Sequence, residues 1–158
     1  MKNKIDISII TLNYQEATLT KLLIESLLAS EGVYYEIIVI DNSCKEKDKL
    51  LLSALKHKDV RVFFMNENLG CARGYNVGIG KARGKYIFIL NNDTLIKDKM
   101  ALSKMKQFMD NHKNVAAIQP KIKSLKNPTY YEYAGAAGGY LDILGYPFCR
   151  GRIFNTLE

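Results

Sequence analysis

The sequence has 158 residues, 47% of them hydrophobic and 25% charged, which is typical of one globular domain and excludes a disordered or low-complexity chain. Its net charge is +7, and residues 97–126 contribute most of it with eight lysines and two aspartates. Three scattered cysteines exclude a disulfide framework and a paired-cysteine zinc site.

Two sequence periods alternate through the first 120 residues. Short continuous apolar runs predict buried strands, and apolar residues spaced three and four apart predict helices. The first predicted helix has Leu19, Leu22, Leu23, Ser26 and Leu27 on one face, which is predicted to face the core. The predicted strands are 5–10, 36–40, 60–65, 86–90 and 115–118, and the predicted helices lie around 19–27, 50–55, 72–82 and 102–109. This alternation predicts an α/β fold with a mostly parallel sheet and helices on both faces.

The chain changes character after Pro120. Seven of the sixteen aromatic residues and five of the eleven glycines lie in the last 32 residues, without a helical period. We predict loops and short strands there, including a hairpin. The expected organisation is an α/β domain over 1–122, incomplete at its C-terminus, and an extension of it over 123–158.

Polar residues follow the first, second and fourth predicted strands, at 13–16, 41–43 and 91–94. In a parallel sheet these carboxyl ends lie at one edge, and ligands bind outside that edge. The sequence therefore predicts that the three clusters converge on one site.

Asp93 is the main candidate for metal binding. A carboxylate beside neutral oxygen ligands suits Mg²⁺ or Mn²⁺ shared with phosphates. The alternative is a turn that caps the next helix, with Thr94 or Asp98 as the N-cap.

Asp41 and Tyr14 are candidates for contact with a nucleoside. A carboxylate at residue 41 is able to accept from a base N–H or a ribose hydroxyl, and the alternative is a turn residue. Tyr14 offers a flat face for stacking, and the alternative is a packed lid. The glycines between Gly70 and Gly80 match neither a dinucleotide fingerprint nor a P-loop, but they let a helix pack close to the sheet.

Six segments in a fixed order resemble the family 2 glycosyltransferases, and they are closest to the rhamnosyltransferase-like branch. The resemblance covers about residues 5–122. The segments are 9–16, 36–43, 66–70, 75–79, 84–94 and 118–122.

The resemblance implies a GT-A fold that binds a nucleotide-diphospho-sugar linked to UDP, dTDP or GDP. Tyr14 would then stack on the base, Leu12 would offer backbone contacts and Asp41 would hydrogen-bond the base. Gly70 and Asn76 would line the pocket.

The segment Asn91-Asn92-Asp93 stands where the family has its Asp-x-Asp motif. The resemblance makes Asp93 the ligand of Mn²⁺ or Mg²⁺, places Asn91 near the ribose and makes Asn92 part of the donor site. Asn91 replaces the usual first carboxylate. Arg73 and Tyr75 stand where the branch often has glycine and asparagine.

An inverting transferase of this family also needs a general base, which its members carry in the second half of the domain. We therefore expect the base beyond Glu158, so that this chain is the donor-binding portion of an enzyme acting on a glycan or lipid-linked acceptor in cell-wall or surface polysaccharide biosynthesis. The rival interpretation is a non-catalytic module that binds nucleotides or nucleotide-sugars.

The lysines of 97–126 are most typical of a solvated helix face. The alternatives are peripheral contact with anionic lipids and nucleic-acid binding. Aromatic residues do not interleave with these lysines as in single-strand binders, so we expect no nucleic-acid partner. Without an apolar signal segment or membrane span in the sequence, we expect a cytoplasmic protein, with the inner face of the membrane as an alternative location.

Overall fold

The computed structural model describes residues 4–132, 139–149, 152–153 and 156–157. The chain forms two compact units, residues 1–112 and residues 113–158. The predicted domain limits, 1–122 and 123–158, stay a prediction.

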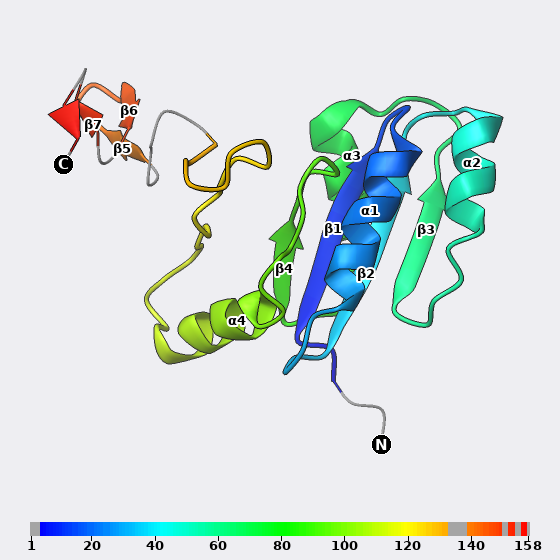
Figure 1. Cartoon of the computed structure of the whole chain (residues 1–158), viewed down its shortest axis with the longest axis horizontal. Coiled ribbons are helices and arrows are strands. Elements are labelled where there is room, and N and C mark those ends of the chain that lie inside the picture. The colour runs from blue at the N-terminus through cyan, green and yellow to red at the C-terminus, as the bar shows by residue number, and fades with distance from the viewer. Residues whose placement is uncertain (1–3, 133–138, 150–151, 154–155, 158) are drawn as a thin grey trace. The chain divides into compact units, whose positions relative to one another are not determined.

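The first unit is a four-stranded, all-parallel sheet with helices between its strands (Figure 1). The strand order is β3-β2-β1-β4, which places β1 and β2 in the centre. This confirms the predicted parallel α/β fold. The elements are β1 Ile7–Asn13, α1 Ala17–Leu28, β2 Tyr35–Asp41, α2 Glu46–Ser53, β3 Val60–Phe64, α3 Gly70–Ile79, β4 Tyr86–Ile89 and α4 Ala101–Asn111.

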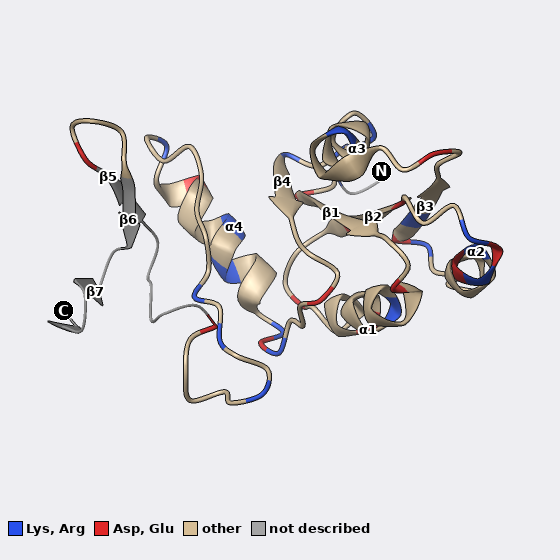
Figure 2. Ribbon diagram, turned by 90° about the horizontal axis from the view of Figure 1, so that it is seen from above, with Lys and Arg blue, Asp and Glu red and all other residues tan. Residues whose placement is uncertain are grey.

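Helices cover both faces of the sheet. Successive side chains of β1 point to opposite faces, and because both sets include buried apolar residues, both faces need a covering helix. Ile9 pairs with Ile37 and faces a core that includes Leu23 of α1 and Leu102 of α4. Ile10 pairs with Ile38 and faces α3. Figure 2 shows α1 and α3 on opposite sides of the sheet.

Glycines allow α3 to lie very close to the sheet, as the sequence predicted. A Cβ atom built on Gly78 would lie 2.3 Å from Cγ2 of Ile10, and one on Gly74 would lie 3.1 Å from Cδ2 of Leu12. Real Cβ atoms do not approach as closely as the first of these distances, so a larger side chain at Gly78 would push α3 away from β1.

The rotation of α1 differs from the prediction. Leu23 and Leu27 are buried as predicted, but Leu19 and Leu22 are exposed and Thr20 is buried instead. The physical reason is a hydrogen bond inside the protein, since the Thr20 hydroxyl donates to Oδ1 of Asn13.

The same asparagine determines the rotation of α2. The sequence marked this helix by Leu50, Leu51 and Leu55. Leu51 and Leu55 pack half-buried against the core, whereas Leu50 is 65% exposed and Leu52 and Asp48 are buried. Asp48 accepts a hydrogen bond from Nδ2 of Asn13, and Leu52 lies one turn further along the same face. Hydrogen bonds to Asn13 therefore place Thr20 and Asp48 on the buried faces of the two helices, and only part of each leucine pattern faces the core.

The predicted strand at 115–118 is wrong. That segment lies in the second unit, is mostly exposed and pairs with no other strand among the described residues. A short apolar run forms a strand only where a neighbouring strand pairs with it.

The predicted hairpin is confirmed, although residues 133–138 in front of it lie outside the described part. The second unit contains two antiparallel pairs: β5 Gly139–Leu141 with β6 Pro147–Cys149, and β7 Arg152–Ile153 with β8 Thr156–Leu157. Across the described ranges, the helices are too short and too polar to cross a membrane.

Candidate functional site

The carboxyl ends of β1 and β4 meet at a hollow of about 260 Å³. Five of the eight predicted donor-binding residues line it: Leu12 and Tyr14 after β1, and the run Asn91, Asn92 and Asp93 after β4. The prediction that these polar clusters converge is confirmed for the first and fourth strands. The sequence did not identify Cys71 and Tyr75, which line the same hollow from α3.

Asp41 lies at the carboxyl end of β2 and lines a second hollow, of about 230 Å³, at the same edge of the sheet. Phe64 and Met65 at the end of β3 form another side of it, and Lys45 and Lys49 contribute positive charge. Asp41 itself is buried, with Oδ1 accepting the backbone N–H of Ser43 at 3.0 Å.

Gly70 and Asn76 lie in α3, and neither is among the residues that line these two hollows in the described part of the chain. The carbonyl of Gly70 accepts a hydrogen bond from Asn42 at 3.0 Å, which holds the start of α3 against the loop after β2. Gly70 has φ +70°, a left-handed conformation that glycine adopts without strain. The donor contacts proposed for both residues stay predictions.

A hydrogen-bond network, half-buried at Asn92 and buried beyond it, runs from the first hollow to the second. Nδ2 of Asn92 donates to the Thr20 hydroxyl at 3.1 Å, and that hydroxyl donates to Oδ1 of Asn13 at 2.9 Å. Nδ2 of Asn13 then donates to Asp41 at 2.8 Å and to Asp48 at 3.1 Å. The sequence offered one sign of this hydrogen-bond network, a threonine on the otherwise apolar inner face of α1. Its bonding partners could be identified only from the structure.

Tyr75 fixes the orientation of Asn91. Its phenol hydroxyl donates to Oδ1 of Asn91 at 3.1 Å and lies 3.4 Å from the carbonyl oxygen of Leu90. Burial raises the pKa of Tyr75, and the nearby Cys71 and Asp93 raise it further. The phenol is therefore a proton donor throughout the neutral pH range.

Asp93 is exposed in the first hollow, where a bound ion would be accessible to a ligand. Among the described residues, no group of three His, Cys, Asp or Glu side chains is placed to hold a metal ion. Mg²⁺ or Mn²⁺ shared with phosphates needs only one or two protein carboxylates and keeps several waters. The residues therefore fit an ion that Asp93 shares with a bound diphosphate, and do not fit a site made by protein alone.

The alternative interpretation of this segment as a turn is right, since Thr94 donates to the carbonyl of Asn91 at 2.7 Å. Its cap is wrong: neither Thr94 nor Asp98 is the N-cap of α4, which is Met100 and has no side-chain cap bond. Asp98 accepts the backbone N–H of Met100 at 2.9 Å in front of the helix. The Asp93 carboxylate is thus not used in capping the helix.

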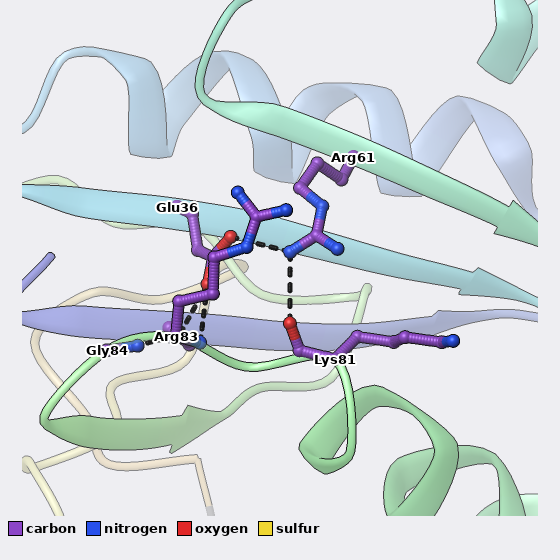
Figure 3. Close-up of polar contacts among 6 residues, drawn as sticks. Glu36, Arg61, Lys81, Arg83 and Gly84 are labelled. Carbon is purple, nitrogen blue, oxygen red and sulfur yellow. Dashed lines mark hydrogen bonds and ion pairs between the residues drawn. The ribbon is translucent and has the colours of Figure 1, made fainter.

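A second polar cluster lies at the opposite, amino-terminal edge of the sheet (Figure 3). The buried Glu36 accepts from the Arg61 guanidinium at 2.9 Å, from the Ser8 hydroxyl at 2.8 Å and from the Arg83 backbone N–H at 2.8 Å. Burial alone would raise the pKa of Glu36, but these three donors together lower it. The cluster fastens the connection between α3 and β4 to the sheet, and so it supports the fold from the side opposite the candidate site.

The sequence matches the family described as Glycosyl transferase family 2 over residues 8–155. It is 33% identical over 92 residues to the succinoglycan biosynthesis protein ExoO of Rhizobium meliloti, a match that covers 58% of this chain and 26% of that protein. It is 27% identical over 129 residues to the glycosyltransferase GlyG of Streptococcus pneumoniae, covering 80% of this chain and 40% of that protein. The chain thus spans less than half the length of these relatives.

Two solved structures share the fold. The mannosyltransferase PcManGT from Pyrobaculum calidifontis, in complex with GDP-Man and Mn²⁺, superposes with a TM-score of 0.60 at 18% identity, over 77% of this chain and 35% of that one. S. aureus TarS 1–349 in complex with UDP-GlcNAc superposes with a TM-score of 0.61 at 19% identity, over 75% of this chain and 38% of that one. These superpositions show a GT-A-like arrangement of the sheet and helices.

Proposed function

The chain belongs to glycosyl transferase family 2, and we propose on that premise that it provides the donor-binding part of an inverting glycosyltransferase. The observation that carries the proposal is the pair of hollows at one sheet edge, one containing Asp41 and the other Asp93. A nucleotide-sugar has two chemically different ends to recognise, a base with N–H donors and a diphosphate with negative charge.

In the proposed arrangement the base lies toward Asp41 and the diphosphate lies toward Asp93. Asp41 has an acceptor-only carboxylate for the base, and Tyr14 offers an exposed aromatic face in the neighbouring hollow. Two solved structures that share the fold were obtained with GDP-Man and with UDP-GlcNAc, which supports a nucleotide-sugar as the ligand class.

We assign Mn²⁺ or Mg²⁺ to Asp93, and the complex of PcManGT with GDP-Man and Mn²⁺ supports a divalent ion. Such an ion would neutralise the charge that develops on the leaving diphosphate. The residues of this chain orient the site around it: Tyr75 holds the Asn91 amide, and Thr94 closes the turn that carries Asp93.

The narrower assignments are also proposals. The motif resemblance favours the rhamnosyltransferase-like branch, with a donor linked to UDP, dTDP or GDP. The similarity to ExoO supports an acceptor in polysaccharide biosynthesis. We place the enzyme in the cytoplasm.

The test is calorimetric titration of residues 1–158 with UDP, dTDP and GDP, each in Mn²⁺ and again in EDTA. We expect one nucleotide to bind more tightly than the others and to lose affinity in EDTA. Absence of binding by all three in Mn²⁺ would refute donor binding. If the affinity in EDTA equals that in Mn²⁺, only the metal assignment is refuted and donor binding stands.

A further inference from the structure

We propose that Thr20 is a positioning residue whose hydroxyl couples the two ends of the donor site, an inference that rests on the donor placement proposed above. Thr20 is fully buried on a helix face that is otherwise apolar, beside Leu23, Ile24 and Leu27. A hydroxyl in such surroundings is unfavourable unless it is hydrogen-bonded. Thr20 uses the hydroxyl both as a donor, to Asn13, and as an acceptor, from Asn92.

The carboxylates of Asp41 and Asp48, at one end of this hydrogen-bond network, determine which group donates in each of its bonds. The amide of Asn13 has to turn its NH₂ group toward Asp41 and Asp48, because carboxylates only accept. Its oxygen therefore faces Thr20 and takes the hydroxyl proton. A lone pair on the Thr20 oxygen accepts from Nδ2 of Asn92. All donors point toward the carboxylates, an arrangement in which each hydrogen bond strengthens the next.

A competing bond within α1 is weaker. The Thr20 hydroxyl lies 3.4 Å from the carbonyl oxygen of Glu16, against 2.9 Å from Oδ1 of Asn13. Since a hydroxyl has one proton, the shorter contact receives it. The hydroxyl thus bonds the sheet and the loop after β4 rather than its own helix.

The consequence is a fixed distance between the two ends of the site. Asn92 precedes Asp93 in the loop that we assign to the diphosphate, and Asn13 holds Asp41, which we assign to the base. A ligand that touches both ends gains from this alignment, because the site does not have to be ordered on binding. A ligand that touches only the base end gains less.

Two substitutions separate the hydroxyl from the shape of the side chain. Thr20→Val removes the hydroxyl and keeps the branched shape, whereas Thr20→Ser keeps the hydroxyl. The matched control is Ser26→Ala, which removes another hydroxyl from α1, one that accepts the backbone N–H of Ile96 at 3.1 Å and lines neither hollow. Each variant is titrated in Mn²⁺ with whichever of UDP, dTDP and GDP binds best, and with the matching nucleoside.

We expect Thr20→Val to weaken nucleoside diphosphate binding by about 5- to 30-fold and nucleoside binding by a smaller factor. Thr20→Ser should restore both, and Ser26→Ala should change neither. Equal losses for the two ligands in Thr20→Val, or a Thr20→Ser variant as weak as Thr20→Val, would overturn the proposal and leave Thr20 a packing residue.

A second measurement needs no ligand and so remains decisive if the proposed function fails. In ¹⁵N–¹H spectra of the free protein, Thr20→Val should shift the side-chain NH₂ signals of Asn13 and Asn92 and the backbone signal of Asp41. Thr20→Ser should leave them near their original positions. If Thr20→Val leaves Asn92 and Asp41 unshifted, the coupling does not exist, whatever the protein binds.

Discussion

Asp93 is the residue on which the proposed metal dependence rests. Asp93→Asn keeps the size of the side chain but removes the charge that would attract the ion. We expect nucleotide affinity in Mn²⁺ to fall by about 10- to 100-fold, the range found when groups that support a bound metal are removed. Affinity in EDTA should change little, and calorimetry in both conditions measures the difference.

Asp98→Asn is the matched control for this experiment. Asp98 also follows β4, but its carboxylate pairs with Lys104 at 2.7 Å and lies outside both hollows. Its loss should leave nucleotide affinity unchanged. Comparable losses in both variants would mean that the charge of the loop, rather than one ligand, attracts the nucleotide.

At the scale of single residues, the sequence predicted which polar residues lie at the edge of the sheet, because the carboxyl ends of parallel strands share one edge. It did not predict the partners of those residues. Tyr75 was noticed only as a departure from a family pattern, whereas the structure shows it bonded to Asn91. Such contacts join residues far apart in the chain, and no local pattern carries that information.

Helix α3 depends on the small side chain of Gly78. Gly78→Ala would place a Cβ 2.3 Å from Ile10, so we expect a loss of about 1–3 kcal/mol in the free energy of unfolding, the usual cost of overpacking. The midpoint of urea unfolding measures it.

Gly80 provides the matched control, two residues further along. A Cβ there would lie 3.5 Å from its nearest neighbour, the carbonyl oxygen of Val77, and its φ is −64°. Gly80→Ala should be neutral or slightly stabilising. If both variants lose the same stability, the loss reflects glycine at this end of the helix and not the contact with β1.

Helix α4 is fastened to β4 by a charge cluster around Asp110. Its carboxylate contacts the ammonium groups of Lys85 and Lys106 and the hydroxyl of Tyr86. The Lys85 ammonium, followed by Lys106 and Tyr86, holds the pKa of Asp110 well below its usual range. The carboxylate is thus bound more favourably in the folded protein than in the unfolded chain.

A carboxylate whose pKa is lowered in the folded state stabilises the fold at pH values above its ordinary pKa of about 4. This stabilisation is lost as the pH falls from there through the lowered pKa. We therefore expect Asp110→Asn to destabilise the protein at pH 7 and to differ less from the original chain at pH 3. Urea unfolding at both values measures this. The exposed carboxylate of Glu25, 3.8 Å from Lys21, offers the control Glu25→Gln, which should change neither midpoint. An equal effect of Asp110→Asn at both pH values would contradict the assignment.

The limits of prediction at the scale of elements have a physical cause. Periodicity located α1 and α2, because apolar residues recur once per turn. It gave their rotation only in part, because Thr20 and Asp48 are turned inward by bonds to an asparagine in β1. Polar residues on these helices were visible in the sequence, but their partner in β1 was not.

The order of elements in the whole molecule was the most predictable feature. Four apolar strands separated by helices are compatible with few chain topologies, and the right-handed crossover rule reduces the number of topologies further. The strand expected at 115–118 was not found, because an apolar run is necessary for a strand but a pairing partner is also required.

The lysines of residues 97–126 are less available than their number suggests, and contact with membranes through them stays a prediction. Lys99 pairs with Glu31, Lys104 with Asp98, and Lys106 with Asp6 and Asp110. We expect weak sedimentation with anionic vesicles at low salt and none at about 0.15 M salt, where charges are screened beyond about 8 Å. Neutral vesicles are the control. Binding that persists at the higher salt would show that these lysines form a membrane site.

The position of β4 at the outside of the four-stranded sheet affects how the first unit behaves in a concentrated solution. An outermost strand keeps one row of backbone N–H and C=O groups unpaired by its own sheet, and such a row is a template for a strand from another molecule. Here the strand also presents Ile87 and Ile89, the latter 50% exposed. Two copies that met along β4 would extend each other's sheets, so protein concentration becomes an experimental variable in every titration described above.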